Sequence, residues 1–261
     1  MSDGSTKYNI DKTKIYWVTG IVIVLFIIMT ALGKRNNGRV KEIIVSIQPL
    51  QGGSDFIKEA DIKTIVKRGF EEDLKDFPVG RVDVARVERV LQQDPFIQKA
   101  EAFVDANNAL NIKITQREPL LRVIDENGLN YYLDKTGFQI PPSKYFSARV
   151  PVATGAIPPY VVDFLTKKRY ALKDLFALTK RIVGDDFLNA LVQQIYVNPA
   201  GEFTLIPILG DQKILIGSLD HLEDKFSRLR IFYDQALPYE GWNKYETINL
   251  KFEGQIVCKR Y

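Results

Sequence analysis

The sequence has little of the chemistry on which most enzymes and metalloproteins depend, since its 261 residues include one histidine, His221, and one cysteine, Cys258. A catalytic triad could use only His221, and no G-x-S-x-G motif accompanies it. A metal site needs several His, Cys, Asp or Glu ligands at suitable spacing, and an internal disulfide needs a second cysteine. The sequence therefore predicts no catalytic residue, no metal site and no internal disulfide.

Phosphate-binding motifs are missing as well, because neither a Walker loop nor a G-x-G-x-x-G sequence occurs. The net charge is only +4, and the 36 Lys and Arg residues are interleaved with 32 Asp and Glu along most of the chain. A nucleic-acid-binding protein usually gathers its basic residues on one face. We therefore expect no cofactor and no nucleic-acid partner.

One long uncharged stretch is present, from Ile15 to Leu32. As a helix its 18 residues would span about 27 Å, close to the ~30 Å hydrocarbon core of a bilayer. We predict an N-terminal tail at 1–14, a transmembrane helix at 15–33 and a juxtamembrane linker at 34–39. The alternatives are a buried helix or a cleaved signal peptide, but the apolar core of a signal peptide is usually only about 7–15 residues long.

The orientation of this span is not fixed by charge, because basic residues flank it on both sides. Only 14 residues precede it, however, whereas 228 residues follow Gly33. The working part of the protein is therefore expected on the C-terminal side of the span.

Residues 40–118 show the pattern of a β-α-α-β-β module. Ile43, Val45 and Ile47 alternate as in a strand, and the apolar residues of the next two segments repeat at helical spacing. The second helix is expected to bury Val84, Val87, Val90 and Leu91. The predicted elements are a strand around Val45, a helix from Glu59 that stops at Gly69, a helix capped by Asp83, and strands at Ile97–Val104 and Leu110–Thr115 joined across Asn107-Asn108.

Residues 119–261 are expected to form a second, β-rich domain with helices, so the whole chain is assigned to the α+β class. Short strands alternate here with turn signals such as Asn127-Gly128 and Asp134 to Gly137. The further elements predicted are a helical stretch at 173–192 with Asp185 or Asp186 as a cap, strands at Ile195–Val197, Phe203–Pro207 and Lys213–Ile216, and a helix that buries Leu222, Phe226, Leu229 and Phe232.

The chain ends in "YETINLKFEGQIVCKRY", which has the pattern of a hairpin. Ile248, Leu250 and Phe252 alternate with polar residues, Glu253-Gly254 supplies a turn, and the chain then returns as a strand. A final strand either closes the sheet, with Phe252 in the core, or leaves its outer edge open to another chain. In the second case the candidate partner-binding residues are Lys251, Phe252, Gly254, Gln255, Ile256, Val257 and Cys258.

Several motifs, taken in order, resemble the bacterial cell-division family FtsQ, called DivIB in some bacteria. "VDVARVERVLQQDPFIQKAEA" (residues 82–102) is similar to the second helix of its POTRA domain and the strand that follows. "LNIKITQREP" (110–119) resembles the exit strand and boundary of that domain. "YYLDKTGFQIP" (131–141) and "INLKFEGQIVCKRY" (248–261) are similar to the opening hairpin and the closing strands of the β-domain.

The resemblance implies a non-enzymatic scaffold of the divisome. Its N-terminus would lie in the cytoplasm, its single span in the inner membrane, and its C-terminal domains outside that membrane at the division septum. The implied partners are FtsB/DivIC-like and FtsL-like coiled-coil proteins, through which such a protein helps to recruit and regulate the septal peptidoglycan synthase.

Two other classes of function stay open at this stage. A membrane-anchored enzyme that acts on the cell wall would turn over a peptidoglycan substrate. A POTRA-bearing secretion or assembly factor would carry a long run of amphipathic strands, whereas only about 140 residues follow the module here and helices interrupt them.

Overall fold

The structure is a computed structural model, and it describes residues 16–17, 19–27, 38–50 and 53–261. The chain divides into two compact units. Unit 1 contains the chain up to Ile47 together with Lys58–Gln93 and Lys99–Ile114. Unit 2 contains Gln48–Ile57, Asp94–Gln98 and Thr115–Tyr261, so it is assembled from three separate stretches.

Residues 19–27 are helical, and residues 21–27 expose their side chains. Within the described ranges no helix combines the length and hydropathy that a bilayer crossing requires. The remainder of the predicted span, at residues 15, 18 and 28–33, lies outside the described residues.

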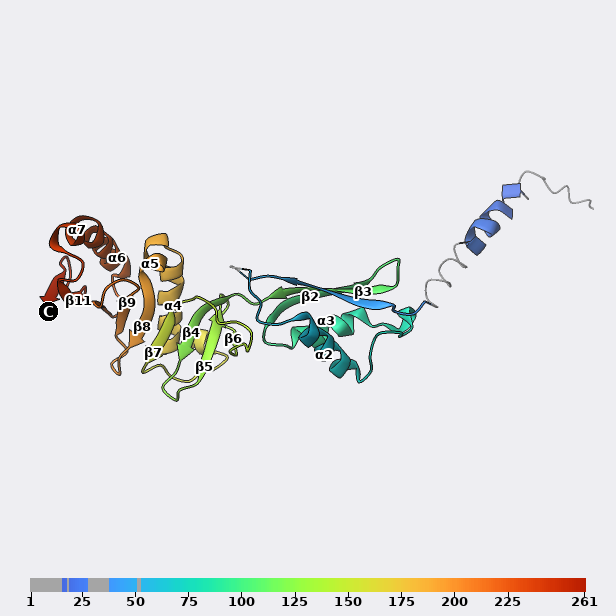
Figure 1. The fold of residues 1–261 in the computed structure, drawn as a ribbon, viewed down its shortest axis with the longest axis horizontal. Helices are drawn as coiled ribbons and strands as arrows, with labels where there is room; N and C mark the ends of the chain where they lie inside the picture. The colour runs from blue at the N-terminus through green and yellow to red at the C-terminus, as the bar shows by residue number, and fades with distance from the viewer. Residues whose placement is uncertain (1–15, 18, 28–37, 51–52) are drawn as a thin grey trace, which may run out of the picture. The chain divides into compact units, whose positions relative to one another are not determined.

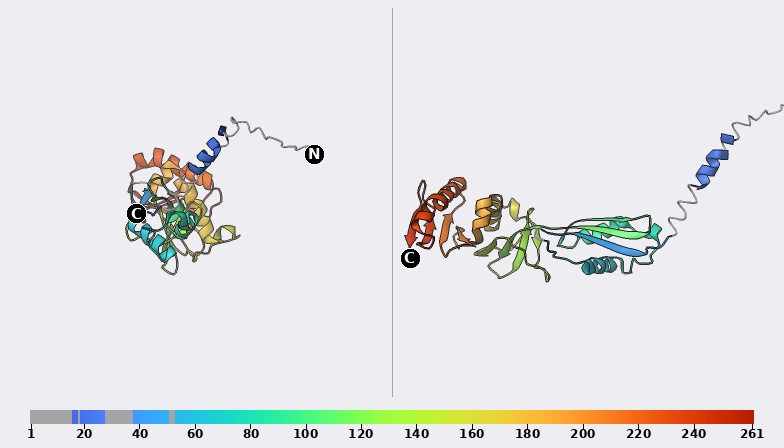
Figure 2. Two further views of the ribbon diagram at one scale, coloured as in Figure 1. Left: turned by 90° about the vertical axis from the view of Figure 1, so that its right-hand side faces the viewer. Right: turned by 45° about the horizontal axis from the view of Figure 1, so that its top comes forward.

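Unit 1 has the predicted β-α-α-β-β order, with two helices on one face of a three-stranded sheet (Figures 1 and 2). The strands follow the spatial order β1-β3-β2. The elements are β1 (Glu42–Gln48), α2 (Glu59–Phe70), a 3₁₀ turn at Val79–Arg81, α3 (Val84–Gln92), β2 (Ile97–Val104) and β3 (Ala109–Gln116).

Helix α3 begins where the sequence predicts, because the Asp83 carboxylate accepts a hydrogen bond from the backbone N–H of Arg86 at 2.9 Å. Val87 and Leu91 are completely buried, while Val84 and Val90 are half-buried. The predicted apolar stripe therefore does face the core of unit 1.

Gly69 has a different role from the helix stop predicted for it. Helix α2 continues to Phe70, and Glu71 ends it in the left-handed region with φ of 60°. A Cβ atom on Gly69 would lie 2.4 Å from Cγ1 of Val90 on α3. The missing side chain thus allows the two helices to approach closely, a requirement that depends on the partner helix and not on the local sequence.

Unit 2 is built on a nine-stranded sheet with the order β12-β11-β10-β9-β8-β7-β4-β5-β6. β4 with β7, β7 with β8 and β10 with β11 pair in parallel, and the other neighbours are antiparallel. The strands are β4 (Pro119–Ile124), β5 (Asn130–Asp134), β6 (Gln139–Ile140), β7 (Val152–Gly155), β8 (Val192–Val197), β9 (Phe203–Pro207), β10 (Lys213–Gly217), β11 (Tyr245–Asn249) and β12 (Val257–Arg260).

The helices of unit 2 lie along one side of this sheet (Figure 1). Asp185 is the cap that divides the helical stretch predicted at 173–192, since its carboxylate accepts the N–H groups of Phe187 and Leu188 at 3.1 Å. The helical elements are a 3₁₀ turn at Phe164–Thr166, α4 (Ala171–Val183), α5 (Asp186–Leu191), α6 (Leu222–Ile231), a π-helical turn at Phe232–Ala236 and α7 (Leu237–Glu240).

The main core of unit 2 lies between these helices and the sheet. Leu175 and Ile182 of α4 belong to the same buried cluster as Ile195 of β8 and Leu205 of β9, and all four are fully buried. Their helical and two-residue spacings place them on the inner faces of their elements, so burial of apolar area drives the assembly of the layers.

A second, smaller cluster of unit 2 is centred on Phe56, which lies between β1 and α2 in the sequence. Its ring contacts those of Phe96, Tyr132 and Phe146 at centroid distances of 5.6–5.7 Å. The buried amide of Gln116 accepts the N–H of Phe56 at 2.8 Å and donates to the Asp55 carboxylate at 2.7 Å. These contacts explain why residues 48–57 belong to unit 2.

We expect the Val87→Asp variant to unfold unit 1, because an unpaired carboxylate at this buried position would cost about 3 kcal/mol or more. Ala85→Asp on the exposed side of α3 is the matched control and should change stability by less than about 0.5 kcal/mol. Thermal melting followed by circular dichroism measures both. Equal melting curves for the two variants would contradict the assignment of this helix face.

Candidate partner-binding site at the sheet edge

Strand β12 is the last strand of the sheet, and among the described residues only one of its backbone edges is paired. It runs antiparallel to β11, with Cys258 opposite Ile248 and Val257 opposite Asn249. No other described strand neighbours β12, and Figure 1 places the C-terminus beside β11. The final strand therefore extends the sheet and presents a free row of backbone donors and acceptors.

The two faces of β12 differ in character. Ile256, just before the strand, and Cys258 pack against the main core of unit 2, and burial raises the pKa of the Cys258 thiol. Val257, on the opposite face, is 44% exposed. Cys258 thus acts as a small apolar residue that anchors the strand, since a raised pKa disfavours the reactive thiolate.

The predicted hairpin is wrong in one respect, because β11 ends at Asn249 and does not reach Phe252. The Asn249 side chain accepts the N–H of Lys251 at 2.9 Å, a local turn that ends the strand. Leu250 is buried, whereas Phe252 is 48% exposed, so the alternative in which Phe252 is a core residue is wrong. The residues between the strands, 250–256, are called the edge loop below.

The candidate residues are therefore divided between two elements. Lys251, Phe252, Gly254, Gln255 and Ile256 lie in the edge loop, where Gly254 takes a φ of 68° that suits glycine. Val257 and Cys258 lie on β12 itself. The candidate residues thus lead from the end of β11 into the open strand.

Lys251 is already engaged within the chain. Its Nζ atom lies 2.5 Å from a carboxylate oxygen of Glu202, and this hydrogen bond lowers the pKa of Glu202. A Cβ atom on Gly217 would lie 2.9 Å from Cγ of Lys251, so the aliphatic stem of the lysine lies over that glycine. A carboxylate from a partner would have to compete with Glu202 for this ammonium group.

Arg228 on α6 is the residue of this site that the sequence does not reveal. Its Nη1 atom donates to the carbonyl oxygen of Phe252 at 3.1 Å and also to that of Gln255. Its Nε donates to the Asp224 carboxylate at 2.8 Å. The i,i+4 spacing of Asp224 and Arg228 predicts their ion pair, but the edge loop is 22–27 residues away in the sequence and only the fold brings it there.

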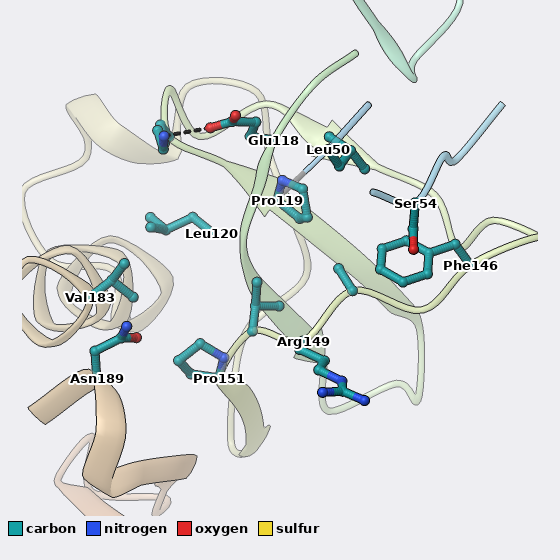
Figure 3. A pocket seen from close by; sticks show the side chains of 13 residues that line it. Leu50, Ser54, Glu118, Pro119, Leu120, Phe146, Arg149, Pro151, Val183 and Asn189 are labelled. Atoms are coloured by element: carbon teal, nitrogen blue, oxygen red, sulfur yellow. Dashed lines mark hydrogen bonds and ion pairs between the residues drawn. The ribbon is translucent and has the colours of Figure 1, made fainter. Parts of the chain in front are cut away.

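A separate groove of about 560 Å³ lies in unit 2 near the start of β4 (Figure 3). Leu120, Phe146 and Pro151 give it an apolar lining, and a Lys135–Glu118 ion pair of 2.5 Å stands at its side. Glu118 thus has a cationic partner within the chain.

No metal centre accompanies either feature, since the described part of the chain holds no group of three or more His, Cys, Asp or Glu that could bind a metal. His221 lies at the N-terminal end of α6 with a left-handed φ of 53°, and its side chain makes no capping hydrogen bond. The open edge of β12 is therefore the candidate binding feature of unit 2.

The sequence profile described as FtsQ/DivIB, C-terminal related, matches residues 118–259, which is more than half of the chain. The chain belongs to the FtsQ/DivIB family. A POTRA-like domain profile matches residues 41–115, in agreement with the β-α-α-β-β order of unit 1.

Two relatives are both named Cell division protein FtsQ. The protein from Rhodothermus marinus is 27% identical over 185 residues, covering 68% of this chain and 66% of the relative. The protein from Salinibacter ruber is 30% identical over 175 residues, covering 63% and 65%. The match thus spans just under two thirds of the length of each relative. The chain is therefore a homologue of cell-division proteins named FtsQ.

Two alanine substitutions test how the structure divides the edge loop. Leu250→Ala is expected to lower the free energy of unfolding by about 2–5 kcal/mol, because it empties a buried site. Phe252→Ala should cost about 1 kcal/mol or less, because half of that side chain is already in water. Denaturant unfolding measures both values, and an equal loss from the two variants would place Phe252 in the core after all.

Proposed function

We propose that this FtsQ-type chain is a non-enzymatic scaffold of the divisome that binds FtsB/DivIC-like and FtsL-like proteins. Through them it helps to recruit and regulate the septal peptidoglycan synthase. The observation that carries the proposal is the open edge of β12, at the end of the domain by which the family is recognised. Turnover of any peptidoglycan substrate by the purified chain would contradict the non-enzymatic part.

The proposed mode of binding is strand addition. A segment of an FtsB-like partner lies beside β12 and completes its ladder, each backbone hydrogen bond contributing about 0.5–1.5 kcal/mol. The strand has no proline, and Lys259, one of the two charged residues at its end, is paired with Glu246 at 2.5 Å. Val257 and Cys258 therefore carry neither a proline nor a charge that would prevent another strand from pairing with this edge.

Phe252 is the proposed side-chain anchor of the interface. Aromatic residues at interface centres often dominate binding, and Phe252 is 48% exposed in the edge loop that leads into β12. Val257 adds apolar area on the outward face of the strand. The backbone thus supplies affinity, and these two side chains supply much of the selectivity.

Successive prolines in β12 provide a test of strand addition. Neighbouring N–H groups along a strand point to opposite edges, so in the variants Val257→Pro and Cys258→Pro one removes an outward donor and the other a donor toward β11. The variant that loses the outward donor should stay folded by circular dichroism but lose capture of the FtsB-like protein of the same organism. The other variant should lose thermal stability. Undiminished capture by both variants would overturn the proposal.

We further propose that residues 15–33 anchor the chain in the inner membrane, with the tail in the cytoplasm and both units outside at the septum. The support is the uncharged stretch from Ile15 to Leu32, which is long for a signal-peptide core. After carbonate extraction of membranes the full-length chain should remain in the membrane pellet. Recovery of a shortened, soluble protein that begins near Lys34 would instead indicate cleavage.

A further inference from the structure

The edge loop combines hydrogen-bonded backbone with an exposed central stretch. Leu250 is buried and its N–H donates to the Leu215 carbonyl of β10 at 2.9 Å. Phe252, Glu253, Gly254 and Gln255 are nevertheless exposed. A four-residue exposed turn that follows a strand end would normally sample several conformations, so something must hold its main chain.

The guanidinium group of Arg228 is placed to do this. It donates to three carbonyl oxygens of the same loop, those of Leu250 at 3.4 Å, Phe252 at 3.1 Å and Gln255. These carbonyls belong to a residue before the turn and to the first and last residues of the turn, so one rigid group contacts both of its arms. The side chain is only 13% exposed, and shielding from water strengthens such charge-assisted hydrogen bonds.

Arg228 is itself held from behind by Asp224. The carboxylate accepts from Nε at 2.8 Å and from Nη2 at 2.8 Å, one helical turn earlier on α6. Asp224 thereby sets the plane of the guanidinium group and leaves its remaining donors facing the loop. The arrangement runs from a rigid helix, through one planar side chain, to the backbone beside the open strand.

We propose that Arg228 is the positioning residue of the partner-binding edge. By holding the edge loop, Arg228 orders the backbone at Phe252 and at the start of β12 before a partner binds. Strand addition then does not have to order this segment. The inference rests on the proposed function and assigns a residue that lies outside the strand and the loop. Binding by a preordered site loses less conformational entropy, which appears as higher affinity.

The test compares two Arg→Lys substitutions on the same helix in the full-length chain. Arg228→Lys keeps the charge but removes the planar fork, and a single ammonium group cannot hold Asp224 and three carbonyls together. Arg230→Lys is the matched control, because Arg230 pairs with Asp185 at 2.7 Å and no hydrogen bond joins it to the edge loop among the described residues. The probe is the purified FtsB-like protein of the same organism.

Two readouts are measured for each variant. Hydrogen exchange of the peptide that covers residues 250–258 should be faster in Arg228→Lys and unchanged in Arg230→Lys. Affinity for the probe should fall at least about tenfold in Arg228→Lys only, since an ordering cost returns to the binding step. Circular dichroism and exchange in unit 1 should match the wild type in both variants, which separates a local effect from general destabilisation.

Each other outcome overturns the inference. Unchanged exchange in Arg228→Lys would show that the loop is held by other contacts, and faster exchange with unchanged affinity would show that its order does not matter for binding. Wild-type protein that does not bind the probe would refute the proposed function itself, and the wild-type titration alone reveals that case.

Discussion

Backbone hydrogen bonding within one continuous sheet is the constraint on which unit 2 depends. Each interior strand has a neighbour on both sides, so among the described residues only the terminal strands β6 and β12 have an edge without a neighbouring strand. The two edge strands of the sheet differ in length and in proline content. β6 is two residues long and is followed by Pro141 and Pro142, which cannot donate, whereas β12 has four residues and no proline. One end of the sheet is protected from pairing with other chains, and the other is left able to pair.

The edge loop shows how an exposed segment can be ordered without being buried. Asn249 turns the chain, Lys251 reaches across to Glu202, and Arg228 holds the carbonyls from the side of α6. All of these contacts use the main chain or the flank of the loop. The side chains of Phe252, Glu253 and Gln255 therefore remain exposed while the main chain beneath them is held by contacts within the chain.

Much of the fold could be predicted from local sequence, because the signals concerned act over a few residues. Asp83 and Asp185 cap the helices that follow them, and the turn at Asp134 forms because its carboxylate accepts the N–H groups of Thr136 and Phe138 at 2.8–2.9 Å. The alternation of apolar residues located most of the strands, but it extended β11 too far. At that point the side chain of Asn249 outweighs the periodicity.

The remaining features depend on residues that are distant in the sequence. The need for glycine at position 69 is explained only by Val90 on the neighbouring helix. The hydrogen bonds of Arg228 to the edge loop form only because the chain returns to α6 after β11. The parallel pairing of β10 with β11 likewise requires the whole α6 crossover. The final strand near the C-terminus could be located from sequence, but the division of residues 250–258 between loop and strand, and the arginine that contacts the loop, could not.

The cluster around Phe56 determines which fragments of the chain can fold on their own. Tyr132 and Ile140 of the β-domain are buried by Leu50 and Phe56, which are encoded more than sixty codons before Pro119. A fragment that starts at Pro119 would therefore uncover an aromatic surface, and Asp55 and Gln116, whose side chains hydrogen-bond to each other, would both be missing. Recombination between relatives at this boundary would pair a Phe56 segment from one parent with a Tyr132 pocket from the other. Sequence drift in these two distant stretches is thus expected to be correlated, even though one of them falls inside the POTRA-like match.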